Sequence, residues 1–459
     1  MRKNHKQREN SVEGYNIGKA ALSRKIRSGE FKIAVYGLGH VGSPLVATWL
    51  RAGAHVIGVD KSPRVLENAK KGKINIHEPG VSEAFSQALK EKRFHLYTDP
   101  IRASQDSNLK LICVPVLLTN SLSADLLAVR QVTTSIARGL KRGDIVSLNP
   151  SVPPGVSEET VIPILEKESG MNVEQDFYMV YNPERIYAGR AVEDLEERYP
   201  AIVAGAGSKS LEIGSSIYRL IAKKGVVRMN SIRAAETEKL LEGVYRDVNI
   251  ALANEMAKFC ESVGVDFWEA RRAANSQPFS HLHKPGAGVG GACIPVYPQF
   301  ILHAARKVGV DCKLTSFGRD SNDSMPAYCV RQALKLLGES DIPNCTVSLL
   351  GLAFRGGVSD TRLSPTYRVI DELKKLKVKR IRVHDPLVTN DPNLSEDIML
   401  TPNLSEAVKD ADLVVLITDH PQYQHLTHKE LYNKPVYDGR GILDGSLFAA
   451  DRFASIGRP

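Results

Sequence analysis

Residues 31–42 read FKIAVYGLGHVG, and their pattern indicates the fold of the chain. A short apolar run rich in β-branched residues ends in glycines. The helical stretch GSPLVATWLRAG comes next, and HVIGVD then has the composition of a second strand. Strand, glycine turn, helix and strand in this order predict a β-α-β unit.

The glycines of this unit, GLGHVG at 37–42, match the pattern G-x-G-x-x-G. The pattern alone is weak, but here it follows a strand and opens a helix, so a dinucleotide site is the favoured interpretation. Gly37 permits the tight turn, Gly39 lets the backbone meet a pyrophosphate at the helix N-terminus, and Gly42 allows close packing of helix on strand. A glycine-rich turn without a ligand is the structural alternative.

The type of dinucleotide follows from Asp60, at the end of the second strand. We expect this carboxylate to accept hydrogen bonds from the adenosine ribose and to repel a 2′-phosphate, which favours NAD over NADP. Lys61 and Arg64 follow closely, and their positive charges act against that preference.

Strand-like and helical stretches alternate along the rest of the chain. LKLICVPV, DIVSLNPS, FYMVYNPE and AIVAG read as further strands, and the rhythm returns from Thr346 with TVSLLGLAF, RIRVHDP, LVVLITD and VYDGRGIL. Between them, residues 232–264 lack proline and read as one long helix ended by Gly264, with a face available to a second subunit. The expected fold class is α/β, with two Rossmann-like, doubly wound parallel-sheet domains joined by a long helix and a helical dimerisation segment.

Length and composition fit a globular protein of several domains. The chain has 459 residues, of which 42% are apolar and 25% charged, and one core cannot serve a chain of this length. Its apolar runs are far shorter than the ~18 residues that a membrane span needs. No charged-then-apolar leader opens the sequence, so we expect a cytoplasmic protein without a signal peptide.

The net charge of +9 is unevenly distributed. Residues 1–32 hold nine Lys or Arg and three Asp or Glu, so most of the excess lies there. A basic tail could contact nucleic acid or an acidic membrane surface. No nucleic-acid motif or aromatic interleaving accompanies it, so a solvated extension is favoured, with neither nucleic acid nor membrane as a partner.

Cysteines are scattered, at 113, 260, 293, 312, 329 and 345, without a CxxC pair. This indicates reduced thiols in a cytosolic protein, with neither a disulfide framework nor a metal site. Cys293 directly follows the glycine-rich run PGAGVGGA. Because glycines let a ligand approach closely, this thiol is either a small hydrophobe or a nucleophile. For the other five cysteines we expect burial in the core.

Seven motifs in order resemble one family, the nucleotide-sugar 6-dehydrogenases of the UDP-glucose/GDP-mannose dehydrogenase family. The resemblance covers residues 31–445. The motifs are GLGHVG, SVPPG, YNPERIYAG, AETEKLLEGVYRDVNIALANE, PGAGVGGACIP, GLAFRGGVSDTRLSP and VYDGRGIL. The resemblance implies that the C6 alcohol of a nucleotide-linked sugar is oxidised to a carboxylate with two NAD.

This resemblance also implies a role for the thiol. A second hydride leaves only from a tetrahedral carbon, so the intermediate aldehyde must first gain a nucleophile. By resemblance Cys293 adds to it, giving a thiohemiacetal and then a thioester that water hydrolyses. Lys239 would stabilise the oxyanion at C6 and Glu184 would activate the water. A solvated helix lysine and a carboxylate at a helix start are the structural alternatives for these two.

Cofactor and substrate contacts carry over in the same way. Ser151 would stand in the loop beside the nicotinamide, and Arg362 and Arg440 in the domain that holds the nucleotide half, where arginine forks suit diphosphate oxygens. The expected cofactor contacts are Gly37, Leu38, Gly39, His40, Val41, Gly42, Asp60, Pro115, Ser151 and Glu184. The expected substrate contacts are Arg185, Ile186, Lys239, Gly288, Gly290, Phe354, Arg355, Arg362 and Arg440.

The domain boundaries follow from the motifs and the long helix. We expect a basic N-terminal extension at 1–28 and an NAD-binding Rossmann domain at 29–210. A central helical dimerisation domain at 211–328 and a UDP-sugar-binding Rossmann-like domain at 329–459 would follow, with a homodimer formed through the central helices.

Three positions depart from the family pattern. Gly243 replaces an asparagine, Tyr297 replaces an aspartate, and Phe279 stands where many members carry an arginine that reaches a neighbouring subunit's sugar site. Asn to Gly empties space and Asp to Tyr fills it. We therefore expect the Tyr297 ring to occupy the room at Gly243 and its hydroxyl to replace the missing polar groups, which makes Tyr297 a catalytic candidate. A degraded site is the alternative.

The substrate branch follows from NPERIYAG, HKPG and CIPVYP. These stretches resemble the branch that acts on UDP-N-acetylhexosamines of the GlcNAc or ManNAc type, and imply a uronic acid for polysaccharide or glycoprotein glycans. The alternatives are a UDP-glucose 6-dehydrogenase, a catalytically altered nucleotide-sugar-binding paralogue, and a two-electron oxidoreductase of the 3-hydroxyacid or 6-phosphogluconate type. The two-electron oxidoreductase would yield one NADH per substrate, whereas a nucleotide-sugar 6-dehydrogenase would yield two.

Overall fold

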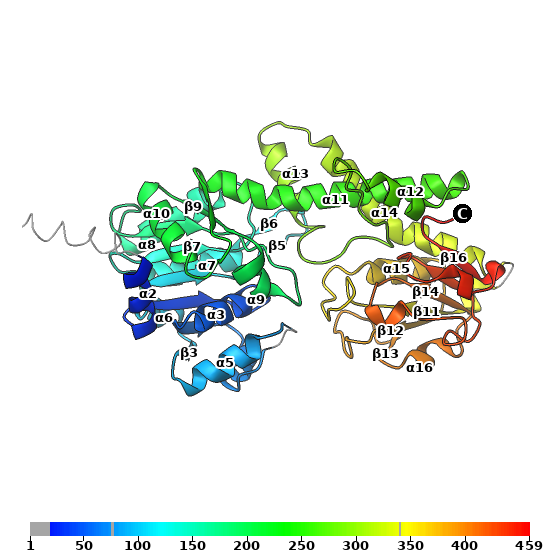
Figure 1. Cartoon of the computed structure of the whole chain (residues 1–459), viewed down its shortest axis with the longest axis horizontal. Helices are drawn as coiled ribbons and strands as arrows, with labels where there is room; N and C mark the ends of the chain where they lie inside the picture. The colour runs from blue at the N-terminus through cyan, green and yellow to red at the C-terminus, as the bar shows by residue number, and fades with distance from the viewer. Residues whose placement is uncertain (1–18, 75–77, 339–340) are drawn as a thin grey trace, which may run out of the picture. The chain divides into compact units, whose positions relative to one another are not determined.

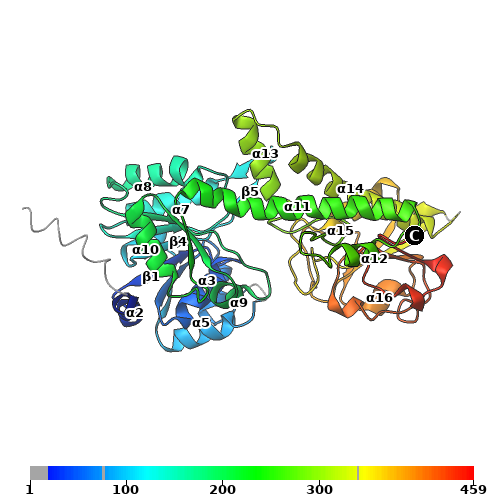
Figure 2. The same cartoon turned by 45° about the horizontal axis from the view of Figure 1, so that its top comes forward.

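The computed structural model describes residues 19–74, 78–338 and 341–459. The chain divides into two compact units, the first ending at Leu240 and the second beginning at Leu241. Figures 1 and 2 show each unit as a sheet with helices packed on it.

The first unit is built on a sheet of eight strands in the order β10-β9-β8-β7-β4-β1-β2-β3. The strands are β1 (Lys32–Tyr36), β2 (His55–Val59), β3 (Phe94–Tyr97), β4 (Leu109–Ile112), β7 (Ile145–Leu148), β8 (Tyr178–Tyr181), β9 (Ala201–Gly205) and β10 (Val226–Met229). A separate pair, β5 (Leu117–Leu118) and β6 (Ala124–Asp125), follows β4. The predicted β-α-β unit is present, because β1 pairs in parallel with both β2 and β4.

Helices of the first unit connect these strands and cover the sheet (Figure 1). They are α2 (Lys19–Ser28), α3 (Gly42–Arg51), α4 (Pro63–Lys70), α5 (Val81–Lys90), α6 (Pro100–Gln105), α7 (Leu127–Arg138), η1 (Ser157–Val161), α8 (Ile162–Ser169), α9 (Ala191–Glu193), η2 (Asp194–Arg198) and α10 (Ser208–Tyr218).

The direction of β9 differs from the parallel arrangement that we predicted for AIVAG. β8 and β9 are antiparallel, and β10 is parallel to β9. Parallel neighbours need a long crossover, usually a helix. The connection from β8 to β9 holds only the short α9 and η2, which do not form such a crossover.

Burial of both faces explains why the central strands are almost wholly apolar. Alternate residues of β1 enter two separate cores: Ile33 and Val35 pack in one with Trp49, and Ala34 and Tyr36 pack in the other. The sheet is thus covered on both sides, as a doubly wound fold requires.

The second unit contains a sheet of six strands in the order β13-β12-β11-β14-β15-β16. All its pairs are parallel. The strands are β11 (Thr346–Leu350), β12 (Arg380–His384), β13 (Met399–Thr401), β14 (Leu413–Leu416), β15 (Val436–Asp438) and β16 (Phe453–Ser455). The helices are α12 (Phe267–Ala274), α13 (Tyr297–Lys307), α14 (Lys313–Lys335), η3 (Ile342–Asn344), α15 (Pro365–Lys375), α16 (Leu404–Val408), η4 (Pro421–Tyr423), η5 (Gly445–Leu447) and η6 (Ala450–Arg452).

One long helix, α11 (Ile232–Ser262), runs across the unit boundary and confirms the helix predicted over 232–264. Gly264 follows it with a φ of +73°, the left-handed conformation that suits a glycine after a helix. Within the second unit its buried positions are small or polar, and four of its large apolar side chains are exposed. The buried residues include Gly243, Asp247, Ala251, Ala253, Asn254 and Ala257, and the exposed ones Leu241, Tyr245, Leu252 and Phe259.

Residues 1–18 of the predicted basic extension lie outside the described residues. Residues 19–28 form α2, whose Leu22 and Ile26 are buried in the core of the first unit. These two residues are four positions apart and therefore share one face of the helix.

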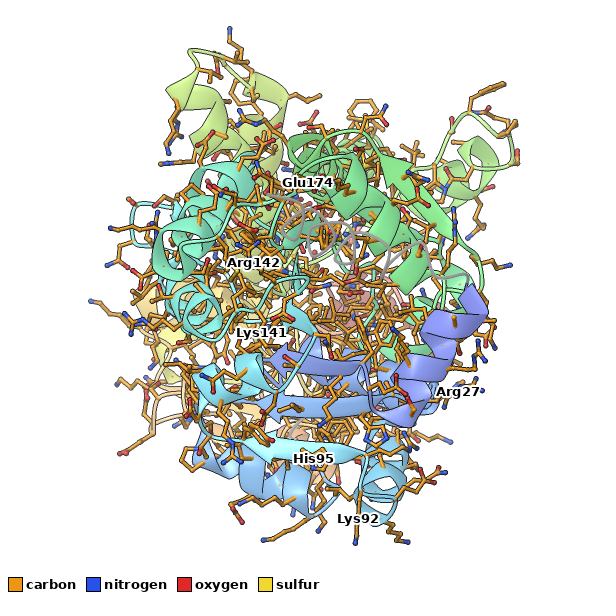
Figure 3. The ribbon with its side chains drawn as sticks, turned by 90° about the vertical axis from the view of Figure 1, so that its left-hand side faces the viewer. Arg27, Lys92, His95, Lys141, Arg142 and Glu174 are labelled. Atoms are coloured by element: carbon orange, nitrogen blue, oxygen red, sulfur yellow. The ribbon has the colours of Figure 1, made fainter. Side chains whose placement is uncertain are left out.

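Basic side chains gather at the edge of the first sheet where the strands begin. Lys92 and His95 lie at the start of β3, and Lys141 and Arg142 precede β7 (Figure 3). Lys141 pairs with the buried Asp144 at 3.3 Å.

None of the helices in the described part of the chain combines the length and apolar character needed to cross a bilayer.

Candidate functional site

The glycine turn after β1 has the shape that the sequence predicts. Gly37 has a φ of +97°, and its N–H donates to the Val59 carbonyl oxygen at 2.8 Å. A Cβ on Gly42 would stand 1.8 Å from the Gly37 carbonyl oxygen, so only glycine fits there. A Cβ on Gly39 would meet nothing within 4 Å. The backbone at Gly39 is thus open to a bound pyrophosphate.

Asp60 fits its predicted role at the second strand. Its Oδ2 accepts the Leu38 N–H and its Oδ1 the Ser62 N–H, both at 2.8 Å. A carboxylate has about four lone-pair sites, so acceptor capacity remains for ribose hydroxyls. Asp60 is half-buried and can be reached. The turn and this carboxylate therefore fit the adenosine and pyrophosphate of NAD.

The other predicted cofactor residues follow neighbouring strands. His40 and Val41 are half-buried in the turn after β1, and Leu38 is buried. Pro115 follows β4, Ser151 follows β7, and Glu184 follows β8. Because β1, β4, β7 and β8 are adjacent and parallel, these residues lie at one edge of the sheet, as binding at a doubly wound sheet requires.

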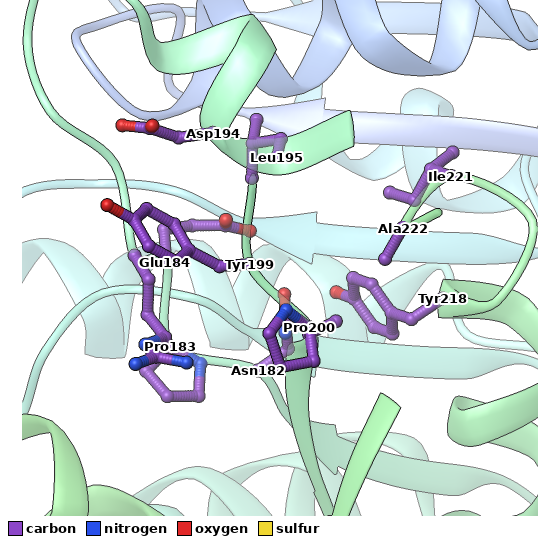
Figure 4. Close-up of a pocket in the computed structure, with 12 residues that line it drawn as sticks. Asn182, Pro183, Glu184, Asp194, Leu195, Tyr199, Pro200, Tyr218, Ile221 and Ala222 are labelled. Atoms are coloured by element: carbon purple, nitrogen blue, oxygen red, sulfur yellow. The ribbon is translucent and has the colours of Figure 1, made fainter. Parts of the chain in front are cut away.

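Glu184 is the carboxylate at this edge, and it is buried with 7% of its surface exposed. Asn149 Nδ2 donates to Glu184 Oε1 at 3.2 Å and to Tyr218 Oη at 3.1 Å. Figure 4 shows Glu184 and Tyr218 among the residues lining a pocket. Burial raises the pKa of Glu184 to about 8, although the Asn149 hydrogen bond and the charge of Lys239 act to lower it.

Lys239 lies in the first unit, on α11, with 5% of its surface exposed. Its charge acts on the Glu184 carboxyl, so the structure brings these two predicted residues together. Arg185 and Ile186 follow Glu184 and are half-buried. The Arg185 guanidinium lies over the Tyr199 ring, 5.4 Å from its centroid, at the same pocket.

Asn149, Asn182 and Tyr218 belong to this site, and the sequence did not single them out. Asn149 Nδ2 also donates to Asn182 Oδ1 at 3.1 Å. A signal was available for the two asparagines, since each directly follows a buried strand and precedes a proline. Tyr218 ends α10 and carries no comparable signal.

Cys293 lies in the second unit and is exposed, whereas Cys113, Cys260, Cys329 and Cys345 are buried and Cys312 is half-buried. The core expectation therefore holds for four of the five other cysteines. Burial raises the pKa of Cys113, and the charge of Glu184 raises it further. Cys293 is thus the one exposed thiol of the six.

The glycine run before Cys293 packs tightly against the segment that follows β11. Gly288 has a φ of +133°. A Cβ on Gly290 would stand 2.6 Å from the Leu363 carbonyl oxygen and 2.8 Å from Phe354 Cβ. The Gly291 N–H donates to the Arg362 carbonyl oxygen at 2.8 Å. The structure thus places the predicted substrate residues Phe354 and Arg362 next to the glycine run.

Tyr297 covers Gly243, as the volume argument predicts. A Cβ on Gly243 would come within 2.5 Å of Tyr297 Cδ2 and 3.0 Å of its Cβ. Tyr297 is 6% exposed, begins α13 and stacks on Phe300 with ring centroids 6.5 Å apart. Any larger residue at 243 would have to displace this ring. The predicted role of the hydroxyl stays a prediction.

The two predicted arginines of this unit each hold an acidic partner. Arg362 Nε donates to both Asp360 carboxylate oxygens, at 2.9 and 3.0 Å. Desolvation lowers the pKa of Arg362, but Asp360, Cys293 and Tyr297 together raise it above its ordinary value. Arg362 therefore lies within the electrostatic reach of the thiol and the phenol.

Arg440 pairs with Asp419 at 3.2 Å and holds the pKa of that carboxyl well below its ordinary value. A Cβ on Gly286 would stand 2.6 Å from Arg440 Nη1. The Arg355 guanidinium lies 5.8 Å from the centroid of the Phe354 ring. These contacts place Arg440, Arg355 and Phe354 around the same glycine-rich segment.

Phe279 stands apart from these contacts. It is 96% exposed in the chain, more than any other large apolar side chain among the described residues. Nothing within the second unit explains an aromatic side chain at this position.

Comparison with known proteins covers most of the chain. Models of the UDP-glucose/GDP-mannose dehydrogenase family match residues 31–222 with the NAD binding domain, 233–324 with the central domain and 348–445 with the UDP binding domain. A UDP-N-acetyl-D-mannosamine dehydrogenase of Pyrococcus horikoshii is 31% identical over 90% of this chain and 96% of its own length. An NDP-N-acetyl-D-galactosaminuronic acid dehydrogenase of Ralstonia nicotianae is 31% identical over 91% of this chain and 97% of its own length.

Solved structures agree. The structure of UDP-D-ManNAc dehydrogenase from Pyrococcus horikoshii superposes with a TM-score of 0.85 at 30% identity, covering 93% of this chain and 99% of that one. Three family domains in order, the open glycine turn with Asp60, and full-length relatives lead to one conclusion. The chain belongs to the UDP-glucose/GDP-mannose dehydrogenase family and is an NAD-dependent nucleotide-sugar dehydrogenase.

Proposed function

We propose that the chain oxidises the C6 alcohol of a UDP-N-acetylhexosamine to the uronic acid, through a thioester on Cys293. The observation that carries this proposal is the exposure of Cys293 at the end of a tightly packed glycine run. A structural cysteine in a core would be buried, as four of the others are. An open thiol can reach a substrate carbon.

The first oxidation needs a group that holds charge at the C6 oxygen. NAD, when bound, supplies the hydride acceptor. Lys239 supplies a buried positive charge that stabilises the developing alkoxide. In the second unit the family's asparagine and aspartate are absent, because Gly243 and Tyr297 occupy their positions. The Tyr297 hydroxyl takes over their polar role and helps to order the C6 hydroxyl.

The second oxidation uses the thiol. The Cys293 sulfur forms a bond to the aldehyde carbon, and the thiol proton ends on the former carbonyl oxygen, which gives a thiohemiacetal. Loss of that proton and of a hydride from the same carbon turns it into a thioester. Arg362, whose guanidinium feels the charges of both Cys293 and Tyr297, stabilises negative charge as the sulfur adds.

Hydrolysis releases the product. Glu184 takes a proton from water, whose oxygen adds to the thioester carbon, and the C–S bond breaks to regenerate the thiol. A carboxyl with a pKa of about 8 is largely protonated at neutral pH and becomes an effective base as the pH rises through that value. The complete reaction consumes two NAD and one water for each sugar.

The relatives support an N-acetylated substrate. Those reported above are named for N-acetylmannosamine and N-acetylgalactosaminuronic acid. A UDP-glucose 6-dehydrogenase and a catalytically altered nucleotide-sugar-binding paralogue are the alternatives. The boundaries proposed for the domains are 29–210 for NAD, 211–328 for the central helices and 329–459 for the UDP-sugar.

A homodimer through the central helices is part of this proposal. The exposed apolar side chains of α11 repeat on one side of the helix, and others lie on and around α14. Patches of this kind mark protein interfaces. The exposed residues on α11 are Leu241, Tyr245, Leu252 and Phe259. Those on α14 or just before it are Val308, Val310, Leu314 and Phe317. Light scattering of the purified chain tests for twice the chain mass.

A substrate panel tests the reaction. UDP-GlcNAc, UDP-ManNAc, UDP-GalNAc and UDP-glucose are incubated with NAD, and NADH and carboxylate are measured together. We expect two NADH for each carboxylate with an N-acetylated member, and no carboxylate from Cys293→Ala. One NADH per substrate would favour the two-electron oxidoreductase, and binding of UDP-sugars without any NADH would favour the altered paralogue.

The phenol has its own test. Tyr297→Phe keeps the ring over Gly243 and removes only the hydroxyl, so we expect the fold to be preserved. We expect the first oxidation to slow. An unchanged rate of C6 oxidation would show that the hydroxyl has no part in it.

A further inference from the structure

The chain leading into the glycine run is held by side-chain amides from two helices. Asn275, just after α12, binds Leu282 through both backbone groups, at 3.0 and 2.8 Å. Asn249 Oδ1 accepts the His283 N–H at 2.9 Å. Asn254 Oδ1 accepts the Gly286 N–H at 2.9 Å. The last of these contacts is the one at the first residue of the glycine run.

Asn254 does not act alone, because its amide is part of a directed chain of hydrogen bonds. Its Nδ2 donates to Asn322 Oδ1 at 2.9 Å. Asn322 Nδ2 in turn donates to the carbonyl oxygen and to Oδ1 of Asp247, both at 2.8 Å. Each amide therefore points its donor toward Asp247 and its acceptor toward the glycine run.

The carboxylate at the end of this chain sets its direction. When it is ionised, the Asp247 side chain can accept hydrogen bonds but cannot donate one, and it also binds the Arg319 guanidinium. Asp247, Asn254 and Asn322 are fully buried and Arg319 is 3% exposed. Breaking one member of such a buried network leaves its neighbours unsatisfied, which costs more than the single bond.

We propose that Asn254, oriented by Asn322 and Asp247, is a positioning residue that fixes the glycine run and with it the Cys293 thiol. This proposal rests on the proposed function of Cys293 and concerns how its loop is held. It also explains why polar residues occupy the buried face of α11 within the stretch YRDVNIALANE. The face that packs inside the second unit carries the side chains that hold the thiol loop.

Two variants test the proposal. Asn254→Ala removes both hydrogen bonds. Asn254→Asp keeps the volume and the acceptor toward Gly286 but loses the donor toward Asn322, so it probes the direction of the chain. Asn393→Ala removes an exposed asparagine of the same unit and serves as the control. The full-length protein is used throughout, and circular dichroism checks folding.

The first readout is amide hydrogen exchange over Gly286–Gly291, and the second is the split between kcat and KM for the UDP-sugar reaction. We expect exchange about 10-fold faster at Gly288 to Gly291, which are not hydrogen-bonded to Asn254. We expect kcat to be about 10-fold lower in both variants, with KM for NAD unchanged. Asp247→Asn should also speed amide exchange and lower kcat, but by a smaller factor than the two Asn254 variants.

Unchanged exchange at Gly288 to Gly291 in folded Asn254→Ala and Asn254→Asp would overturn the positioning role, and so would faster exchange with wild-type kcat. Failure of the proposed function gives a different signature, because carboxylate would then still form in Cys293→Ala. If Asn254→Ala does not fold, Asn254→Asp and Asp247→Asn decide the question with the same readouts.

Discussion

The two sheets of this protein share a topology but differ in the surroundings of the aspartate that follows the second strand. Counted from their first strands, both follow the order 3-2-1-4-5-6, with β9 and β10 added in the first unit. Gly37 N–H donates to the Val59 carbonyl oxygen at 2.8 Å, and Gly351 N–H donates to the His384 carbonyl oxygen at 2.7 Å. An aspartate then follows the second strand of each sheet.

These aspartates have different surroundings. Asp60 is half-buried and accepts two backbone N–H groups. Asp385 is fully buried and accepts the N–H groups of Leu352, Ala353, Leu387 and Val388 and a contact from His420 Nε2 at 3.1 Å. Its acceptor sites are filled from within the protein. A ribose hydroxyl has no place there.

The turns also differ. Helix α3 begins at Gly42, directly after the glycine turn, whereas α15 begins only at Pro365, long after Gly351. A helix N-terminus close to the first strand is what binds a pyrophosphate. One fold thus serves two purposes, because side chains and turns, and not strand order, make a dinucleotide site.

The largest effect is expected from removing Asp385, the aspartate of the second sheet. Asp385→Ala leaves four backbone donors and His420 without their acceptor, so we expect the free energy of unfolding to fall by about 3–5 kcal/mol. Urea denaturation measures it. The matched change Asp60→Ala should cost far less stability, and equal losses for the two variants would remove the distinction between a structural and a binding aspartate.

Asp60→Ala sharpens the same comparison from the side of the cofactor. The predicted role of Asp60 implies that its removal costs charge-assisted hydrogen bonds to the ribose, so the Kd for NAD should rise roughly 10- to 100-fold. Isothermal titration with NAD checks this. Glu67→Ala, an exposed carboxylate in the same unit, is the control. NAD binding that survives Asp60→Ala unchanged would mean that the carboxylate does not hold the ribose.

Gly243→Asn tests whether Gly243 and Tyr297, the two departures from the family pattern, depend on one another. The new Cβ would stand 2.5 Å from the Tyr297 ring, so overpacking should cost about 1–3 kcal/mol of stability. Adding Tyr297→Asp removes the ring, and the double variant should recover part of the loss. Thermal unfolding of both single variants and the double one gives the coupling, and strictly additive losses would separate the two positions.

The smallest effect concerns pH. In the proposed hydrolysis step Glu184 acts as a base only when deprotonated, so the rate of carboxylate formation should rise with pH through about 8. The Asn149 hydrogen bond lowers that pKa, so Asn149→Ala should move the midpoint upward by about one pH unit or less. Rate–pH profiles of the two proteins decide it. Tyr297→Phe, in the other unit, should leave the midpoint in place.

Local patterns predicted a large part of this structure. FKIAVYGLGHVG and Asp60 predicted the first strand, its turn and its carboxylate, and the long helix was read from spacing and the absence of proline. Both depend on residues close in sequence. The glycine and tyrosine exchange was also readable, since it needs only volumes at two positions.

What escaped prediction depends on partners far apart in sequence. Tyr218 joins the Glu184 network through Asn149, which is 69 positions away. The arginine fork of Arg362, expected on a diphosphate, has Asp360 on its Nε and lies within electrostatic reach of the thiol. The direction of β9 is set by the short connection before it, and nothing in AIVAG itself encodes that direction.

The exposure of Cys293 has a practical consequence. A mild electrophile offered to the folded protein meets this sulfur first, since four of the other thiols are buried and Cys312 is partly covered. A fluorescent chloroacetamide would therefore tag the chain at one defined atom. The same openness makes that sulfur vulnerable to peroxide, so preparations kept without a reducing agent should lose turnover while keeping their fold.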